Sequence, residues 1–260
     1  MKRFMTTAFV LMLLGTNALR GADFGDLTAT FVLDGTAPAP KKLDTSKEPM
    51  CNADGSAVLD EKLVVNKENN GIRDVVVYLF LKPNEKAPAA HPDQEKLREQ
   101  DVELANMGCR FEPRIALVMT NQKLVVTNGD KFGHNTNLGL IDNPSQNPNL
   151  PAGAKIDFKF AKAEKLPMPV ACNIHPWMQG FVLIKDHPFM GVSDANGKLT
   201  IKNVPTGSRT FQLWAGAFVT EGKQNGKAAK WERGRVTIDI KPGTNDLGEI
   251  NIPVKHFQAK

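Results

Sequence analysis

The segment Ala171-Cys172-Asn173-Ile174-His175-Pro176-Trp177-Met178 decides the fold and the chemistry expected of this sequence. It places a thiol, an imidazole and a thioether close together, at the spacing C-x2-H-x2-M. Strand-like runs flank it, from Pro169 to Cys172 and from Phe181 to Lys185, so a loop between two strands is expected to carry all three side chains. A second imidazole, His134, follows an earlier strand and turn. Two adjacent strands can therefore bring four ligand atoms together.

The four residue types suit copper. Thiolate and thioether ligands suit Cu(I), imidazole suits Cu(II), and two His with one Cys and a weak axial Met form the blue-copper ligand set. Taken singly, a Cys or Met here is usually a core residue, but the joint spacing is specific. Zinc prefers Cys, His and carboxylate ligands, and a Met gives no reason to choose it. We therefore predict one type 1 copper ion, with His134, Cys172, His175 and Met178 as its ligands.

The surrounding segments resemble those of the cupredoxin family, in particular amicyanin and plastocyanin. The resemblance is carried by Phe111-Glu112-Pro113, by the run from Leu124 to Asp130, by Gly133-His134-Asn135 and by the tight C-x2-H-P-x-M loop. It covers roughly residues 109–185. It implies a Greek-key β-sandwich with copper at one end, and electron transfer rather than enzymatic catalysis as the activity.

The rest of the chain also predicts an all-β protein. Short apolar runs alternate with turns, helped by 21 glycines and 17 prolines, a pattern typical of sandwiches and barrels. Residues 92–104 are expected to form a short surface helix in an insertion. The C-terminal part resembles a smaller β-sandwich, the carboxypeptidase regulatory-like domain. The expected division is a signal peptide over 1–22, a cupredoxin-like copper domain with an N-terminal extension over 23–187, and the small module over 188–260.

The N-terminus has the pattern of a secretory signal peptide. Lys2 and Arg3 precede an apolar run from Phe4 to Leu14, and small residues follow, so cleavage is expected after Ala18 or Ala22. The run is shorter than the roughly 20 residues of a membrane span. The sequence therefore predicts a periplasmic or secreted protein without a membrane span.

An exported chain tends to pair its cysteines, and an odd one needs another role. Since Cys172 belongs to the expected copper site, Cys51 and Cys109 are expected to form a disulfide. Closing a loop of this length stabilises the fold by roughly 4 kcal/mol in the chain-entropy model.

The sequence also suggests roles for the two histidine ligands and for residues near the copper site. His134 is expected to be the buried imidazole, and His175 the exposed edge through which electrons pass. Redox partners are expected to dock near His175 and Trp177. Asn135 is expected to hydrogen-bond across the site and steady the ligand loop. His187 is expected to be a junction residue with a hydrogen-bonded ring rather than a ligand.

Other function classes fit the sequence less well. The net charge is +5, but no cluster of basic and aromatic residues indicates nucleic-acid binding. Multicopper oxidases and nitrite reductases need His-x-His or adjacent Cys-His segments, which this sequence lacks. A copper-handling protein, which stores or delivers the metal, is the main alternative, although the nine Met are dispersed. A structural or carbohydrate-binding role of the C-terminal module is a further one.

Overall fold

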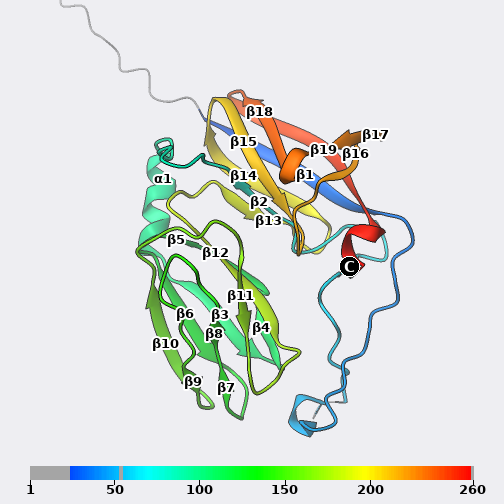
Figure 1. Cartoon of the computed structure of the whole chain (residues 1–260), viewed down its shortest axis with the longest axis vertical. Coiled ribbons are helices and arrows are strands. Elements are labelled where there is room, and N and C mark those ends of the chain that lie inside the picture. The colour runs from blue at the N-terminus through cyan, green and yellow to red at the C-terminus, as the bar shows by residue number, and fades with distance from the viewer. Residues whose placement is uncertain (1–23, 53–54, 259–260) are drawn as a thin grey trace, which may run out of the picture.

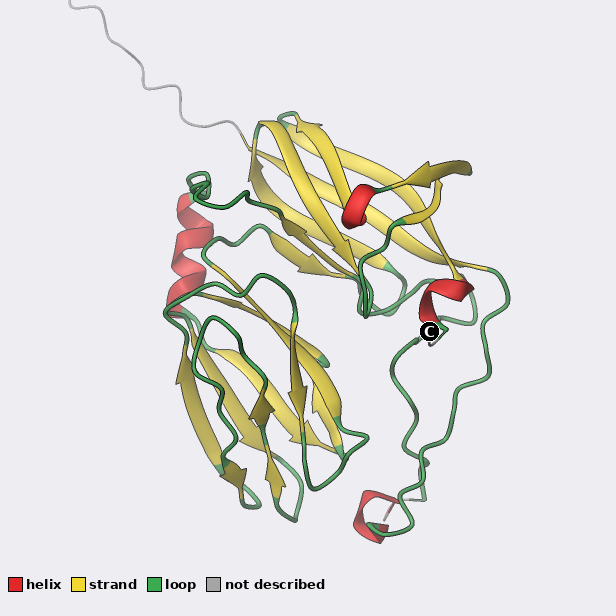
Figure 2. Cartoon of the chain, in the orientation of Figure 1, coloured by secondary structure: helices red, strands yellow, loops and turns green. Residues whose placement is uncertain are grey.

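The computed structural model describes residues 24–52 and 55–258. The signal peptide expected over 1–22 therefore lies outside the described residues. Within them, no helix is both long and apolar enough to cross a lipid bilayer. The chain forms two β-sandwiches stacked one on the other (Figures 1 and 2), which confirms the all-β prediction. We call them the central sandwich (β3 to β12) and the terminal sandwich (β1, β2 and β13 to β19).

The central sandwich consists of two four-stranded sheets and a short ribbon. The first sheet has the order β10 (Lys155–Lys159), β6 (Lys123–Asn128), β3 (Val102–Met107) and β4 (Arg110–Glu112). The second has the order β5 (Ile115–Met119), β12 (Gln179–Lys185), β11 (Met168–Ala171) and β8 (Asn137–Leu138). The ribbon pairs β7 (His134–Asn135) with β9 (Asn149–Leu150).

Alternating residues of these strands face a shared core. In β6, every second residue is buried, among them Leu124 and Val126. They belong to the same apolar cluster as Phe111 of β4 and as Val182 and Ile184 of the opposite sheet. Period-two burial is what a strand with one face on a core requires. The core thus fixes which face each strand presents, and with it the strand ends that carry the candidate ligands.

The terminal sandwich also has two sheets. The first has the order β14 (Lys198–Pro205), β1 (Phe24–Asp34), β19 (Gly243–Pro253), β16 (Glu221–Gln224) and β17 (Lys227–Lys230). The second has the order β13 (Met190–Val192), β2 (Val76–Leu79), β15 (Gly207–Trp214) and β18 (Arg235–Ile240). The helical turns are η1 (Pro49–Asn52), α1 (Pro92–Glu95), η2 (Lys96–Glu99), η3 (Glu232–Gly234) and η4 (Val254–Phe257).

The strand pairing corrects the expected domain division. The strand β1, expected in an extension of the copper domain, pairs antiparallel with β14 and parallel with β19. Likewise β2 lies between β13 and β15. The buried Leu27 and Phe31 of β1 share a core with Ile201 and Phe211. Both strands thus belong to the terminal sandwich, and a boundary at 187/188 does not separate the two units. The strands that pair with β1 and β2 lie far along the chain, and the local alternation of apolar and polar residues cannot identify such distant partners.

The insertion expected around residues 92–104 is shorter than predicted. The helical part, α1 with η2, ends at Glu99. Residues from Val102 onward form β3, which lies between β6 and β4 in the central sandwich. The strand was missed because its outer residues, Val102 and Glu103, mix an apolar and a charged side chain without clear alternation.

The two sandwiches contact each other through one sheet of each. A separate apolar cluster joins Val76 and Trp214 of the terminal sandwich to Ile115 and Leu183 of the central sandwich. The rings of Phe181 and Trp214 meet edge to face, with centroids 4.7 Å apart. The outward side chains of these sheets are therefore buried as well, which explains why β2 is buried at all four positions.

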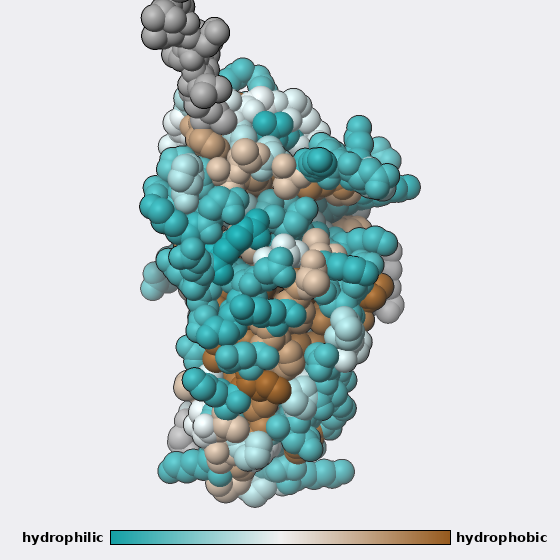
Figure 3. Space-filling model, turned by 90° about the vertical axis from the view of Figure 1, so that its left-hand side faces the viewer, coloured by the Kyte–Doolittle hydropathy of each residue, from teal (hydrophilic) through white to brown (hydrophobic). Residues whose placement is uncertain are grey.

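The surface seen from the side that carries α1 is mostly hydrophilic. Figure 3 shows teal residues over most of this face, with brown, apolar residues gathered between them near the middle. Such a mixture is ordinary for a folded protein surface.

His187 lies at the junction between β12 and β13, as expected, but its environment is drier than predicted. The side chain is 2% exposed and stacks on Phe189, with ring centroids 5.6 Å apart. Its Nδ1 has no hydrogen-bond partner among the described residues. Burial lowers the pKa of His187 from 6.5 to about 4, with the charge of Lys185 adding to this effect and that of Asp186 opposing it.

This burial predicts a pH-dependent stability. As the pH falls from 6.5 towards 4, the unfolded chain binds a proton at His187 and the folded chain does not. The free energy of unfolding should therefore decrease over this window, by on the order of 2–3 kcal/mol. Denaturant unfolding of the wild type and of His187→Phe, measured from pH 4 to 8, checks this. The variant should show the flatter profile; equal slopes would contradict the assignment.

Candidate metal centre

The turn before His134 is built by a buried asparagine at the end of β6. The side chain of Asn128 donates to the carbonyl oxygens of Phe132 (2.8 Å) and Leu150 (2.9 Å) and accepts from the amide of Asp130 (3.0 Å). These bonds satisfy turn groups that would otherwise be buried without partners. The turn thereby directs His134, the first residue of β7, into the end of the sandwich.

The other three candidate ligands lie on the loop that joins β11 to β12. These strands are antiparallel, with Ala171 opposite Gln179, so the loop of residues 172–178 closes a hairpin. The amide of Cys172 donates to the carbonyl oxygen of Met178 (3.2 Å). The amide of Met178 donates to the carbonyl oxygen of His175 (2.8 Å). These bonds fold the loop back on itself. Cys172, His175 and Met178 are each only 1% exposed, as is His134.

Three ligand atoms converge at the end of the central sandwich. The Nδ1 atoms of His134 and His175 lie 3.0 Å apart, and the Cys172 Sγ lies 3.8 Å and 3.6 Å from them. Metal–ligand bonds of about 2.0 Å to imidazole and about 2.3 Å to thiolate match such separations between ligand atoms. Met178 lies in the same apolar cluster as Cys172. The donor set of two imidazoles, one thiol and a neighbouring thioether therefore fits a copper ion.

Asn135 connects the two parts of the site. Its Oδ1 accepts from the amides of Asn173 (2.7 Å) and Ile174 (3.3 Å) and lies 3.4 Å from the Cys172 Sγ. Its Nδ2 in turn donates to Asn147. The prediction that Asn135 hydrogen-bonds across the site to the ligand loop is confirmed. Bonds to two consecutive loop amides fix the direction in which the Cys172 side chain points.

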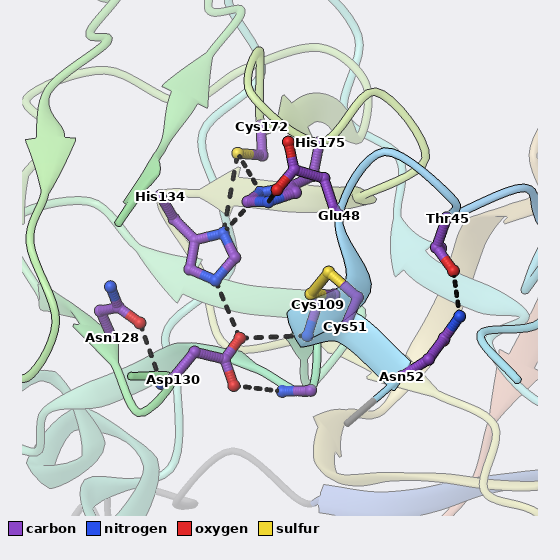
Figure 4. The surroundings of a disulfide bond; sticks show 11 residues. Thr45, Glu48, Cys51, Asn52, Cys109, Asn128, Asp130, His134, Cys172 and His175 are labelled. Carbon is purple, nitrogen blue, oxygen red and sulfur yellow. Dashed lines mark hydrogen bonds and ion pairs between the residues drawn. A yellow bond between two sulfur atoms is a disulfide. The ribbon is translucent and has the colours of Figure 1, made fainter. Parts of the chain in front are cut away.

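Two carboxylates that the sequence analysis did not identify lie behind the histidine rings (Figure 4). The Oδ2 of Asp130 lies 2.8 Å from the Nε2 of His134. The Oε2 of Glu48 lies 3.8 Å from the Nε2 of His175. A signal for Asp130 was present, since it stands four residues before His134 in the turn that was recognised. Glu48 comes from a distant loop, and nothing in its local sequence indicates this position.

The hydrogen bonds of the site shift the pKa values of its titratable groups. Burial opposes the charge of His134, but the hydrogen bonds to Cys172 and Asp130 outweigh it and raise the pKa. Burial likewise opposes the Cys172 thiolate, but the bond to His134 and the loop amides lower its pKa overall. The pKa of His175 is lowered, by burial first and then by the charge of His134. The lowered pKa of Cys172 makes its thiolate, the form that binds metals, easier to form than that of an ordinary cysteine.

The predicted disulfide between Cys51 and Cys109 is confirmed and lies directly against the site. A ring nitrogen of His175 and the two disulfide sulfurs are all within 4.8 Å of one another. Since these sulfurs are bonded to each other, they offer no thiolate to a metal ion. Cys172 is the free cysteine, as expected.

The expectation that His175 forms an exposed edge is wrong. Its ring is 1% exposed because residues 44–52, which include η1, lie over it; we call this segment the cap. Figure 1 shows the chain running from β1 down to η1 at the ligand end of the central sandwich. Phe132 and Trp177 also flank the ring, with centroids 5.7 Å and 5.5 Å from it. A minimal sandwich without the cap would leave this ring open, which is why the ligand loop alone suggested exposure.

Comparison with known proteins finds structural similarity to copper proteins. No protein-family model and no curated protein matches the chain. A copper-containing nitrite reductase from Thermus scotoductus SA-01 is 17% identical over 41% of this chain, with a TM-score of 0.30; the chain spans 25% of the reductase. A purple cupredoxin from Nitrosopumilus maritimus is 19% identical over 32% of this chain and 97% of its own, with a TM-score of 0.27. A Cu(I) amicyanin variant is 14% identical over 43% of this chain and 98% of its own, with a TM-score of 0.30.

Proposed function

We propose that this chain is an exported blue-copper electron carrier that holds one copper ion through His134, Cys172, His175 and Met178. The observation that carries the proposal is the convergence of two imidazole Nδ1 atoms and one thiol sulfur within 3.8 Å of one another in a buried site. When bound, copper supplies the exchange of a single electron between two oxidation states that this mixed donor set accommodates.

The residues of the chain provide the conditions for that exchange. Asn135 and the two strands β11 and β12 hold the ligand loop in one conformation. A fixed ligand set reduces the rearrangement that accompanies a change of charge. Burial of all four side chains excludes water, which would otherwise compete for the metal. The disulfide supports export, because such bonds persist in oxidising compartments.

Docking of a redox partner is proposed at the surface nearest to the ligand loop. Ile174 is 48% exposed and Pro176 is also exposed, which gives an apolar rim of the kind that brief protein contacts use. Because His175 itself is covered, electrons would cross either Trp177 or the cap to reach the site.

Titration of the metal-free protein with Cu(II) tests the proposal. One equivalent should produce an intense visible absorption from charge transfer between the thiolate sulfur and Cu(II), and a reversible one-electron couple should follow in voltammetry. Copper binding without that absorption would reject the electron-carrier function and favour the copper-handling alternative.

Replacing the proposed axial ligand should tune the site without destroying it. Met178→Leu keeps a buried apolar side chain of similar volume but removes one electron-donating ligand. Although a thioether suits Cu(I), losing any donor destabilises the more highly charged Cu(II) more than Cu(I). The visible absorption should persist and the reduction potential should rise, because a weak axial ligand adjusts the potential more than it holds the metal. Voltammetry of both proteins measures this. An unchanged potential would remove Met178 from the ligand set.

A further inference from the structure

The cap is attached to the central sandwich close to the ligands. The disulfide ties Cys51, in η1, to Cys109 in the turn between β3 and β4. On either side of the cap, the amide of Leu43 donates to the Val58 carbonyl oxygen at 2.9 Å, and both side chains pack against the core of the central sandwich. Inside the cap, the amide of Cys51 donates to the carbonyl oxygen of Glu48 at 3.0 Å. The position of Glu48 is therefore set by the disulfide three residues away.

The carboxylate of Glu48 faces the nitrogen of His175 that points away from the other ligands. The Nδ1 of His175 faces the His134 ring and the Cys172 sulfur, while its Nε2 lies 3.8 Å from the Glu48 Oε2. That distance is in the ion-pair range, and a hydrogen bond requires an approach of roughly 0.8 Å. The Glu48 side chain is 38% exposed, so it has room to make this small movement.

The second histidine, His134, also has a carboxylate at its Nε2, and this one lies at hydrogen-bond distance. The Oδ2 of Asp130 lies 2.8 Å from the Nε2 of His134 and also accepts from the Cys109 amide at 3.1 Å. Its Oδ1 accepts from the Gly108 amide at 2.7 Å. Cys109 thus holds Asp130 through its backbone amide, as Figure 4 shows, and Cys51 holds Glu48 through the backbone bond inside the cap.

We infer that Glu48 and Asp130 are positioning residues, each holding the Nε2 of one histidine, and that the Cys51–Cys109 disulfide sets both carboxylates in place. This inference rests on the proposed copper function. A carboxylate behind a metal-binding imidazole fixes the tautomer and the ring orientation and makes the opposite nitrogen a stronger donor. Two such pairs favour the more highly charged Cu(II), so they lower the reduction potential and slow copper release.

The test compares Glu48→Ala and Glu48→Gln with Asp44→Asn, which changes a carboxylate of the same cap that bonds the side chain and the amide of Ser46. Both Glu48 variants should raise the reduction potential, because both remove the charge. Glu48→Ala should also weaken copper affinity by about 10–100-fold; Glu48→Gln should recover part of this, since its amide oxygen still accepts from Nε2. Asp44→Asn should match the wild type, and Asp130→Asn should raise the potential as well.

A measurement on the metal-free protein separates this inference from the proposed function. Nitrogen-15 NMR should show the Nε2–H tautomer of His175 in the wild type and in Glu48→Gln, and a mixture of tautomers in Glu48→Ala. If the Glu48 variants keep the wild-type potential, copper release and tautomer while the visible absorption is present, the positioning role is overturned and the carrier function stands. If copper gives no such absorption, the function fails, and the tautomer result still decides the inference.

Discussion

Replacing Cys172 by serine abolishes the intense visible absorption expected of the copper-loaded protein. The absorption requires charge transfer from a thiolate sulfur, and a serine hydroxyl is a much poorer donor at neutral pH. Cys172 is the free cysteine and is 1% exposed, so no other thiol can take its place. Its oxygen replacement is smaller and remains within reach of Asn135, so the fold should persist. Absorption spectra of both proteins at one equivalent of Cu(II) measure the effect.

The neighbouring variant Ala171→Ser serves as a control, because it adds a hydroxyl at the end of β11 and leaves the proposed ligands unchanged. It should keep the absorption at wild-type intensity. Circular dichroism should confirm that both variants retain their β-structure. A Cys172→Ser protein that is as strongly coloured as the wild type would exclude the thiolate as the source of the colour, and the type 1 assignment with it.

Removing the disulfide is expected to have the largest effect on stability. The bond joins residues 58 positions apart, and opening a loop of this length should lower the free energy of unfolding by roughly 4 kcal/mol in the chain-entropy model. The double variant Cys51→Ala and Cys109→Ala leaves Cys172 as the one thiol. Urea unfolding of the metal-free proteins should show the midpoint shifted to lower concentration, with a slope at least as steep as that of the wild type, because the unfolded chain without the cross-link exposes more surface.

The same double variant should also expose His175, because the cap loses its covalent attachment. Extraction of copper by an external chelator should then be faster than in the wild type. Alkylation of the unfolded, unreduced wild type should label one cysteine, which verifies the bond before the comparison. A variant with wild-type stability and wild-type extraction would show that the packing of Leu43 and Val58, on either side of the cap, against the central core is enough to hold the cap in place.

The features that depend on residues close together in the sequence could be predicted from the sequence alone. Ligand spacing at Cys172, His175 and Met178 is encoded within one loop, and the strand endings around it follow from short-range alternation. The disulfide followed from the count of three cysteines once Cys172 had another role. The structure brings Cys172 and His175 together with His134, as the spacing indicated.

What could not be predicted depends on contacts between distant parts of the chain. The register that places Leu27 opposite Ile201 is a property of two complementary strands, and alternation identifies a strand but not its partner. The burial of His175 has a similar cause. It depends on where the cap runs, and the polar and proline-containing composition of that segment carries no signal of its destination.

The pairing of β1 has a consequence for the order in which the protein can be completed. This strand is made before all others in the described chain, yet it lies in the middle of its sheet, between β14 and β19. The segment from β3 to β12 contains all four proposed ligands, and its strands can pair with one another before the rest of the chain has been made. In contrast, β1 cannot complete its pairing until β19 (Gly243–Pro253) has been made. Pairing between strands so far apart in the sequence is slow, and until it is complete the unpaired edges of β1 can pair with wrong strands. We therefore expect the metal-binding end of the protein to fold before the terminal sandwich, and β1 to stay unpaired until the last strands of its sheet have been made.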